Sequence, residues 1–342
     1  MTTAYNTKEE VAALGETDPE FSEYIKKHNL QDISDLAKII SPTGADASAN
    51  VDSGETLNIP LRDGSTSEIR IFHLKNPPTK KPLIVMIYGG GFFMGDNNQL
   101  SPLSRVVSEV YNAMVVNISY RLAPAHKFPT AVNDTWDSLK WLADNYQTLG
   151  ADPSTGFILY GASAGGNLAA VSAQKWLDEK CFPPLTGISL SVPIILEKSL
   201  VPEKYKELWF SRDQNADAMV LNKQSMMYIM QSYEPDIHSP DYSPFNSKTP
   251  HTGLPPVYLC VSGQDPLRDD GLVYEKILRD HGVKTKLDVY PGVPHGHGMF
   301  PGLQSGTRSY FDTVKSFGWL LGDERSDEDV RKFLPGGKPL LS

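Results

Sequence analysis

Short apolar runs alternate with amphipathic helical segments over most of the chain after residue 81. The runs are rich in β-branched residues and read PLIVMIY (82–88), AMVVNISY (113–120), GFILYG (156–161), ISLSVPI (188–194), PPVYLCVS (255–262) and TKLDVY (285–290). Between them lie helical patterns such as AVNDTWDSLKWLADNY (131–146) and DGLVYEKILRDHG (270–282). Strands that alternate with helices predict an α/β fold, in which helices cover both faces of a mainly parallel sheet.

The segments before residue 82 have a different texture. TLNIPL (56–61) and SEIRIFHL (67–74) flank Asp63-Gly64, a dipeptide suited to a tight hairpin turn. We therefore expect two antiparallel strands ahead of the parallel ones, which makes eight strands in all. Further upstream, DPEFSEYIKKH (18–28) and DISDLAKII (32–40) predict two short helices, followed by a small polar linker from residue 41.

One interval interrupts the alternation of strands and helices. Residues 195–250 contain helix-forming stretches, among them NKQSMMYIMQSYEPD (222–236), but no convincing strand. We interpret this interval as an insertion into the α/β fold.

A candidate nucleophile follows the third of the parallel runs. Gly161-Ala162-Ser163-Ala164-Gly165 lies between the run FILY and an alanine-rich helical segment. A G-x-S-x-G pattern occurs by chance in many chains, but between a strand and a helix it places the serine on a sharp, exposed turn. The N-terminus of the following helix also favours negative charge at this point. Ser163 is therefore predicted to be the nucleophile.

A serine needs a base to take its proton and a carboxylate to orient that base. In this kind of fold the order along the chain is Ser, then Asp or Glu, then His. Asp265 follows the run PPVYLCVS and His295 follows TKLDVY, so both stand after strands, where α/β sheets carry their active sites. The rivals are less suited, because Asp269 and Asp270 fall at the start of the next helix, where capping and dipole roles are the plainer explanation.

His297 lies two residues from His295 and remains an alternative base. The two histidines could also suggest a metal site, but no clustered carboxylates or cysteines complete one. We expect neither a metal nor an organic cofactor.

Three glycines, Gly89, Gly90 and Gly91, directly follow the first parallel run. Such a run persists where the backbone must approach another group closely or adopt dihedral angles closed to other residues. Acyl transfer passes through an oxyanion that backbone N–H groups stabilise, and a loop at this place in the fold supplies them together with the residue after the nucleophile, Ala164. A tight turn would be the simpler explanation of the glycines if Ser163 stood alone.

Composition narrows the class of partner. The chain has 342 residues, of which 40% are hydrophobic, and a formal net charge of -9 with no basic stripe, so a nucleic acid is not an expected partner. No stretch reaches the roughly 20 apolar residues of a membrane span. Cys181 and Cys260 stand among apolar residues and are expected to be small buried side chains. We expect a cytoplasmic protein that acts on a small molecule.

Together these motifs resemble those of the hormone-sensitive lipase-like carboxylesterases, a family of the α/β-hydrolase fold. The resemblance covers roughly residues 55–320 and rests on YGGGFFMG (88–95), YRLAPAHKFPTAVNDTWDSLKWL (120–142), GASAGG (161–166), GQDPLRDDG (263–271) and YPGVPHGH (290–297). It implies Ser163 as nucleophile, Asp265 as orienting acid and His295 as general base. It also implies oxyanion donors at Gly90, Gly91 and Ala164, with Gly89 shaping the loop.

The resemblance further implies a helical cap over the site, built from an N-terminal segment and an insertion. We accordingly expect residues 1–50 and 195–250 to form the cap and residues 51–194 and 251–342 to form the core. Tyr88 departs from the family, which usually has histidine before the glycines to hold the loop in place, and the consequence for loop geometry is open. His297 replaces a common phenylalanine.

The substrate is less clearly indicated. Apolar residues follow the glycines and populate the insertion, where methionine adapts to irregular ligand shapes. The candidates for substrate contact are Phe92, Phe93, Met94, Trp209, Met226 and Met230. Each of them could equally pack the cap onto the core. Collectively they favour a small or medium-sized apolar or aromatic ester over a sugar or a charged substrate.

We therefore expect a serine carboxylic-ester hydrolase that works through an acyl-enzyme. Alternatives within enzymes are hydrolysis of a lactone or acetyl ester, transacylation, or cyclisation in a biosynthetic pathway. An alternative of another class is a small-molecule receptor on the same fold, as in the plant gibberellin receptors, but that alternative predicts a damaged triad. A homodimer is left open by the sequence.

Overall fold

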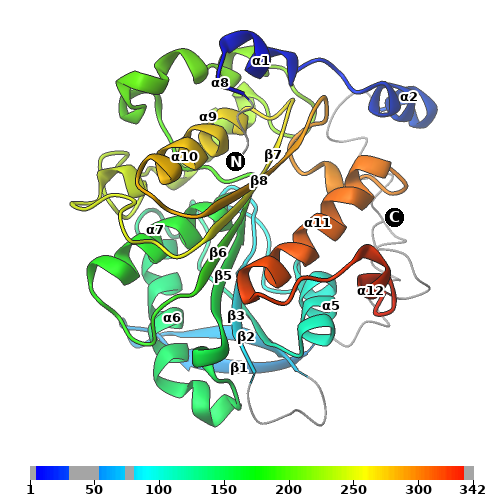
Figure 1. Ribbon diagram of the computed structural model, residues 1–342. Helices are drawn as coiled ribbons and strands as arrows, with labels where there is room; N and C mark the ends of the chain where they lie inside the picture. Colours follow the sequence, from blue (N-terminus) through cyan, green and yellow to red (C-terminus); the bar gives the residue numbers. More distant parts are fainter. Residues whose placement is uncertain (1–4, 31–53, 74–80, 335–342) are drawn as a thin grey trace.

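A single twisted sheet of eight strands forms the centre of the protein in a computed structural model, which describes residues 5–30, 54–73 and 81–334 (Figure 1). The strand order across the sheet is β1-β2-β4-β3-β5-β6-β7-β8. The strands are β1 (Glu55–Pro60), β2 (Thr66–Phe72), β3 (Leu83–Ile87), β4 (Met114–Ile118), β5 (Phe157–Ala162), β6 (Gly187–Ser191), β7 (Val257–Ser262) and β8 (Thr285–Tyr290).

The directions of the strands agree with the prediction. β1 pairs antiparallel with β2, and β2 antiparallel with β4, whereas all pairs from β4 to β8 are parallel. The hairpin between β1 and β2 turns at Asp63-Gly64, where Gly64 has a φ of 85° and the Asp63 carboxylate accepts a hydrogen bond from the Ser65 N–H. The predicted α/β class and the predicted hairpin are confirmed.

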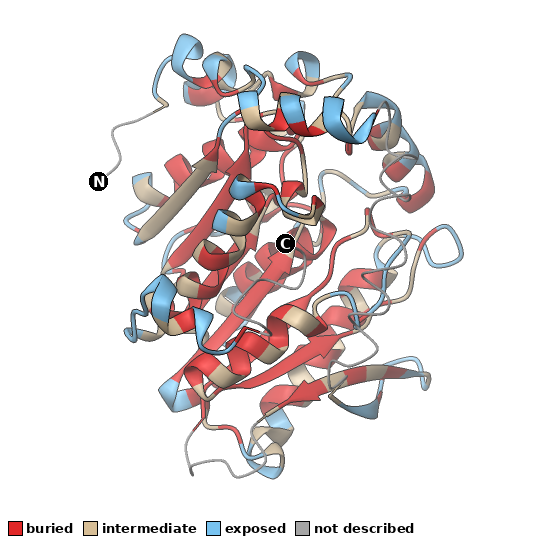
Figure 2. Ribbon diagram, turned by 90° about the vertical axis from the view of Figure 1, so that its right-hand side faces the viewer, coloured by how far each residue is buried: buried red, intermediate tan, exposed pale blue. Residues whose placement is uncertain are grey.

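Helices cover both faces of the sheet (Figure 1). On one face lie α6 (Thr130–Leu149), α7 (Ala164–Asp178) and α10 (Arg268–Asp280), and on the other α5 (Ser101–Tyr111) and α11 (Gln304–Leu321), with α12 (Asp327–Arg331) packed on both. Successive side chains of a strand point to opposite faces. In β3, Val85 and Ile87 accordingly join the apolar cluster of α6 and α7, while Ile84 and Met86 join that of α5 and α11. Figure 2 shows the central strands and the inner sides of these helices buried, whereas the edge strands β1 and β8 are more exposed.

The remaining elements lie outside this layered core. The N-terminal part carries α1 (Lys8–Ala13) and α2 (Pro19–His28). The interval 195–250 carries α8 (Ser211–Gln214), α9 (Lys223–Tyr233) and the 3-10 turns η2 (Lys198–Leu200), η3 (Glu203–Leu208) and η4 (Pro244–Asn246), and no strand, as expected. Two further 3-10 turns are η1 (Pro153–Thr155) and η5 (His297–Met299).

The N-terminal helices agree only in part with the prediction. The predicted helix at 18–28 is confirmed as α2, which begins after Asp18, whose side chain caps the N–H of Phe21. The predicted helix at 32–40 lies outside the described residues. α1 was not predicted, and it has a capping box in which Thr7 and Glu10 each accept a backbone hydrogen bond. Its six residues carry only one buried side chain, Val11, which is too little for a recognisable pattern.

No helix in the described ranges has the length and apolar character that crossing a bilayer requires. Both cysteines are free thiols, Cys260 buried and Cys181 half-buried.

Candidate active site

Ser163 lies on a strained turn between β5 and α7. Its φ of 54° and ψ of -115° are unusual for a residue with a side chain, and such strain is frequent at functional sites. The turn depends on its glycines, because a Cβ at Gly161 would lie 2.1 Å from the Gly165 carbonyl oxygen. A Cβ at Gly165 would lie equally close, 2.1 Å, to the carbonyl oxygen of Ile87 on β3. The close passage of strand and helix therefore raises the Ser163 side chain above the carboxyl end of the sheet.

The structure brings Ser163, His295 and Asp265 into one chain of contacts. His295 follows β8, and its Nε2 lies 3.0 Å from Ser163 Oγ. Its Nδ1 lies 2.6 Å from Oδ2 of Asp265, which follows β7 and is fully buried. With the Nδ1 proton donated to the carboxylate, the lone pair of Nε2 faces the serine hydroxyl, which is the arrangement a general base requires.

The loop that carries Asp265 is fixed from two sides. Oδ1 of Asp265, the carboxylate oxygen that does not face His295, accepts a hydrogen bond of 2.8 Å from the Leu267 N–H. Asn215, in the 195–250 insertion, donates through Nδ2 to the carbonyl oxygens of Asp265 and Gly263 at 2.9 and 3.1 Å. Asn215 could not be predicted to take part in the site, since a single buried amide in an insertion has no recognisable pattern.

His297, the alternative base, is placed elsewhere. Its Nδ1 lies 3.0 Å from the hydroxyl of Ser262, at the end of β7, and its ring packs 4.9 Å from that of Tyr290. Burial lowers the pKa of His297 to about 4, so this imidazole is neutral at physiological pH. The structure therefore assigns the contact with Ser163 to His295 and a buried structural position to His297.

The glycine run lies against the nucleophile. A Cβ at Gly89 would be 2.8 Å from the Ala162 carbonyl oxygen and 3.2 Å from Cβ of Ser163, so only glycine fits there. Gly90 and Gly91 have φ angles of 129° and 58°, in the region that favours glycine. In the described ranges no group accepts a hydrogen bond from the N–H of Gly90, Gly91 or Ala164. These N–H groups therefore remain available as donors.

Tyr88, which stands in place of the usual histidine, is held by a partner that sequence reasoning missed. Its ring stacks on that of Tyr120 at 4.3 Å and 10°. Each hydroxyl donates to the other residue's carbonyl oxygen, at 3.1 Å from Tyr88 and 3.0 Å from Tyr120. Burial raises the pKa of both hydroxyls, so they remain neutral donors. This reciprocal pair anchors the start of the glycine loop to the end of β4.

The predicted substrate contacts divide into packing residues and pocket residues. The Phe92 side chain is fully buried and stacks on Tyr233 of α9 at 4.0 Å, so it packs the insertion onto the core. Phe93 packs edge-on against Tyr228, and Met94 is 53% exposed. Met226 and Met230 of α9 do line a pocket.

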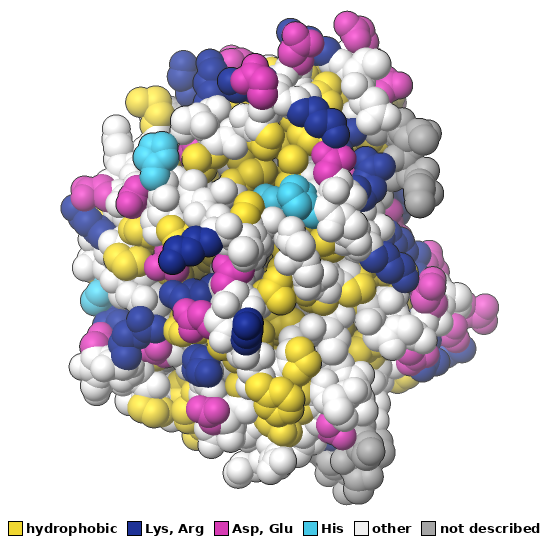
Figure 3. Space-filling model, turned by 60° about the vertical axis from the view of Figure 1, so that its left-hand side comes forward, with side chains coloured by type: hydrophobic (Ala, Val, Ile, Leu, Met, Phe, Trp, Pro, Cys, Tyr) yellow, Lys and Arg dark blue, Asp and Glu magenta, His cyan; other side chains and the backbone are white. Residues whose placement is uncertain are grey.

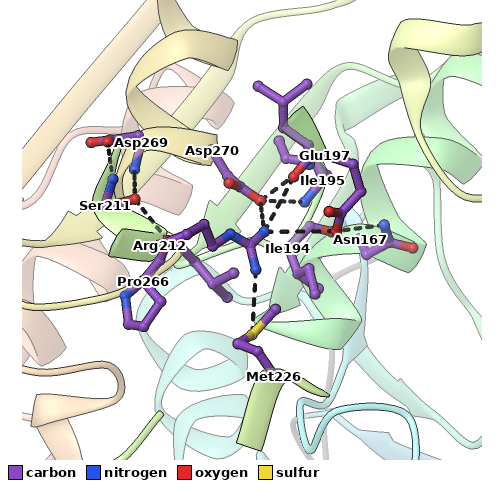
Figure 4. A network of polar contacts seen from close by, with 12 residues as sticks. Asn167, Ile194, Ile195, Glu197, Ser211, Arg212, Met226, Pro266, Asp269 and Asp270 are labelled. Carbon is purple, nitrogen blue, oxygen red and sulfur yellow. Dashed lines mark hydrogen bonds and ion pairs between the residues drawn. The ribbon is translucent and has the colours of Figure 1, made fainter. Parts of the chain in front are cut away.

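A polar network around Asp270 ties the insertion to α10 (Figure 4), and Trp209 takes part in it. Its indole N–H donates to the Asp270 carboxylate at 3.0 Å, which makes Trp209 part of an anchor. Asp270 also accepts from the N–H groups of Ile195 and Leu196, both at 3.1 Å, and from Arg212 at 2.9 Å. Burial raises the pKa of Asp270 to about 7, although the Arg212 guanidinium opposes this.

Asp269 forms a second anchor beside the first. Its carboxylate accepts from the Ser211 N–H at 2.6 Å (Figure 4), from the Phe210 N–H at 2.7 Å and from Arg268 at 2.7 Å. The expected capping role of Asp269 and Asp270 is therefore wrong, because both side chains bind residues some 60 to 75 positions away in the insertion. The pair of adjacent carboxylates after Asp265 was the available signal, but nothing local indicated the partners.

Charged side chains and possible metal ligands form no separate site in the views and ranges that the structure describes. Positive and negative side chains are interspersed on the face shown in Figure 3, between gathered apolar side chains. In residues 5–30, 54–73 and 81–334, no three His, Cys, Asp or Glu side chains lie close enough together to hold a metal ion.

Comparison with known proteins places this geometry in a family. Residues 84–299 match a family model described as alpha/beta hydrolase fold. The chain is 34% identical to an AB hydrolase superfamily protein of Schizosaccharomyces pombe, covering 91% of this chain and 96% of the relative. It is 32% identical to the versiconal hemiacetal acetate esterase of Dothistroma septosporum, with coverages of 84% and 86%. The crystal structure of vibralactone cyclase superposes with a TM-score of 0.82 at 29% identity, covering 91% of this chain and 96% of that one. The chain therefore belongs to the α/β-hydrolase fold family, among its hormone sensitive lipase-like carboxylic-ester hydrolases.

Proposed function

We propose that Ser163, His295 and Asp265 are the catalytic triad of this ester hydrolase, and that its substrates are small or medium-sized esters with an apolar or aromatic body. The observation that carries the proposal is the chain of contacts of 3.0 and 2.6 Å from the Ser163 hydroxyl through the imidazole to a fully buried carboxylate. A receptor on this fold has no need of that alignment, so the geometry favours an enzyme.

The reaction proceeds through a covalent acyl-enzyme. Ser163 Oγ attacks the ester carbonyl carbon while His295 Nε2 takes the hydroxyl proton. The carbonyl oxygen becomes an oxyanion, which the N–H groups of Gly90, Gly91 and Ala164 stabilise, each by about 3 kcal/mol. The intermediate then collapses, the C–O bond to the alcohol breaks, and His295 returns the proton to the alcohol. Water next attacks the acyl-enzyme, with His295 as base, and releases the acid and free Ser163.

Turnover of aryl esters of graded chain length tests the proposal, with Ser163→Ala as the control. We expect hydrolysis that the substitution lowers by about 10⁵ to 10⁶ in kcat, with a maximum at short or medium acyl chains. Covalent labelling of the purified protein by an organophosphate, located at Ser163 by mass spectrometry, checks the activation of the hydroxyl without knowledge of the substrate. Equal turnover by the wild type and Ser163→Ala would refute the proposal.

Intramolecular acyl transfer is a second candidate, which the likeness to vibralactone cyclase favours. The same acyl-enzyme is then attacked by a hydroxyl group of the acyl chain instead of by water, and a lactone leaves. Reaction in ¹⁸O-labelled water separates the two outcomes. Hydrolysis places one ¹⁸O atom in the acid, whereas cyclisation places none in the lactone.

We also propose that residues 1–50 and 195–250 form a cap on a core of residues 51–194 and 251–342. Two contacts between the described parts of these segments support this division. Gln214 donates to the carbonyl oxygen of Ala12 at 2.8 Å, and Lys8 lies 5.6 Å above the ring of Phe210. α9 in turn packs on the glycine loop through Tyr233 and Phe92.

A further inference from the structure

A pocket of about 320 Å³ opens between α8, α9 and the loop after β7. Three methionines of α9 form much of its wall, and we call it the methionine pocket. Its lining residues are Glu197, Arg212, Lys223, Met226, Met227, Met230, Gln231 and Pro266. Small-molecule sites typically have volumes of about 300 to 1,000 Å³ and apolar walls with a few placed polar groups. The methionine pocket has this character.

The methionine pocket lies beside the proposed catalytic groups. Pro266 directly follows Asp265, the partner of His295. On α9, Ile229 lies against the glycine loop, because a Cβ at Gly91 would be 2.8 Å from its Cγ1. Met226 is one helical turn before Ile229, about 5 Å along the helix axis. One helix thus borders both the glycine loop and the methionine pocket.

Arg212 is a charged group of the pocket whose hydrogen-bond donors are only partly satisfied. Its Nη2 donates to Asp270 at 2.9 Å and to the Leu196 carbonyl oxygen at 3.2 Å. Its Nη1 contacts only the sulfur of Met226, at 3.4 Å (Figure 4), and its Nε is buried with no acceptor among the described residues. A thioether is a weak acceptor, whereas a guanidinium carries five N–H donors. The Nη1 edge, at the pocket wall, therefore lacks a strong acceptor.

The surrounding charges indicate which acceptor this edge can take. Asp270 and Glu197 lie 2.9 and 4.0 Å from the guanidinium, so its positive charge already faces two carboxylates. A third carboxylate, brought by a substrate, would meet their repulsion. A neutral oxygen gains the hydrogen bond from a charged donor without that repulsion.

We propose that Arg212 determines specificity by donating from Nη1 to a neutral oxygen, such as a ketone, lactone carbonyl or hydroxyl, on the part of the substrate that enters the methionine pocket. The preferred substrate is then an apolar ester with a second oxygen away from the scissile bond. This inference rests on the proposed function, since it concerns the ester that Ser163 attacks. A hydrogen bond from a charged group is expected to raise kcat/KM roughly tenfold or more over the ester that lacks the oxygen.

Matched esters test the inference. Two series of aryl esters with one chain length are compared with the plain ester, one series with a ketone moved stepwise along the acyl chain and one with a ketone on the aryl side. Each kcat/KM is divided by the rate of alkaline hydrolysis of the same ester, which removes intrinsic reactivity. We expect one ketone position to be preferred about tenfold or more.

Substitutions at Met226 then test whether Arg212 is responsible. Met226→Gln places an amide oxygen beside Nη1 and should abolish the preference, because the donor is satisfied internally. Met226→Leu, of similar size and without an acceptor, is the matched control and should keep it. Arg212→Met should also abolish it, but this variant leaves Asp270 buried without its cation and can fail to fold, so Met226→Gln decides.

The readout is the ratio of kcat/KM for the ketone ester to kcat/KM for the plain ester. A variant that lowers the turnover of both esters equally leaves this ratio unchanged. An even ratio at every ketone position in the wild type would overturn the inference while leaving the proposed function intact. A preference that survives in Met226→Gln would overturn the role of Arg212. Absence of Ser163-dependent turnover for every ester, plain or substituted, would instead refute the proposed function, and the inference with it.

Discussion

At the scale of single residues, the site depends on which atoms are donors and which are acceptors. Asp265 is buried and accepts from both the imidazole and the Leu267 N–H, so its carboxylate has a fixed orientation. The tautomer of His295 follows from that carboxylate, because only Nδ1–H can be donated to it. An amide at this position would keep the shape of the side chain, but its NH₂ group would face either the imidazole or the Leu267 N–H, and both of these contacts require an acceptor.

Asp265→Asn is therefore expected to lower kcat about 10⁴-fold while the fold is retained, since the imidazole is held in the wrong tautomer. Steady-state kinetics with an aryl ester, together with the circular dichroism spectrum, measure the two effects. Asp144→Asn, at an exposed position of α6, is the control and should leave both unchanged. A fall of less than tenfold in Asp265→Asn would contradict the role of the carboxylate.

The Tyr88–Tyr120 pair leads to a second prediction. Tyr88→Phe and Tyr120→Phe each remove one hydrogen bond and keep the ring stack, so each should lower the free energy of unfolding by about 1 kcal/mol. We expect kcat to fall in Tyr88→Phe, because this substitution removes a hydrogen bond that anchors the start of the glycine loop. Urea unfolding of the two single variants and the double variant gives the coupling between them. Unchanged stability in both single variants would show that the pair does not anchor the loop.

At the scale of elements, the two carboxylates at the start of α10 determine how the 195–250 insertion sits on the core. Asp269 binds the backbone where α8 begins, and Asp270 binds the backbone at Ile195 and Leu196. Backbone N–H groups at both places have no other acceptor in the described residues. Removal of either carboxylate leaves buried donors unpaired, which is costly.

Asp269→Ala is expected to lower the free energy of unfolding by about 3 to 5 kcal/mol, because the fully buried Arg268 loses its counter-ion along with the two N–H groups. Limited proteolysis should cleave residues 195–250 faster than in the wild type, and urea unfolding measures the stability. The matched control is Asp217→Ala, at an exposed position of the same insertion. If both variants resist protease equally, the anchor is not needed to hold the insertion.

The elements themselves could be predicted where their patterns are local. The apolar runs of β3 to β8 and the Asp63-Gly64 turn carry their own signals, and so does the turn at Ser163. The contacts between the 195–250 insertion and α10 could not be predicted, because Asp270 and Ile195 are 75 positions apart and neither shows a local preference for the other. Phe92 illustrates a different limit. An apolar side chain after a glycine loop has one pattern whether it lines a pocket or packs under a helix.

At the scale of the whole molecule, the order of the strands explains why distant residues meet. β3, β5, β6, β7 and β8 are neighbours in the sheet, and parallel strands end at one edge. The glycine loop, Ser163, Asp265 and His295 follow β3, β5, β7 and β8 at that edge. The order of these motifs along the chain was enough to predict this convergence. The walls of the methionine pocket could not be predicted, because they depend on contacts between the insertion and the core.

Two buried histidines link the stability of the molecule to pH. Burial lowers the pKa of both His251 and His297 to about 4, below the ordinary value near 6.5. Because the folded state favours the neutral form, each histidine stabilises the fold above pH 6.5, and this contribution is lost as the pH falls from 6.5 to 4. The loss is about 3 kcal/mol for each residue.

Urea unfolding between pH 7 and pH 4.5 measures this loss. In His297→Phe the free energy of unfolding should fall less steeply with acid than in the wild type, and His251→Phe should behave likewise. The difference between two slopes of unfolding free energy against pH isolates the substituted histidine, because all other titrating groups are common to the wild type and the variants. Asp270 is one of these groups, and its raised pKa makes the fold more stable as the pH falls, opposite to the histidines. Parallel slopes in the wild type and both variants would contradict the prediction.

The stretch from Asp265 to Asp270 has a consequence for protein engineering. Within six residues it carries the carboxylate that orients the imidazole and both anchors of the insertion. Grafting a foreign insertion onto this scaffold would therefore disturb proton transfer as well as substrate choice, unless the replacement reproduces its hydrogen bonds to this stretch. Directed evolution toward new esters is better confined to solvent-facing positions of α9, such as Met227, where a change alters the wall of the methionine pocket and leaves that stretch intact.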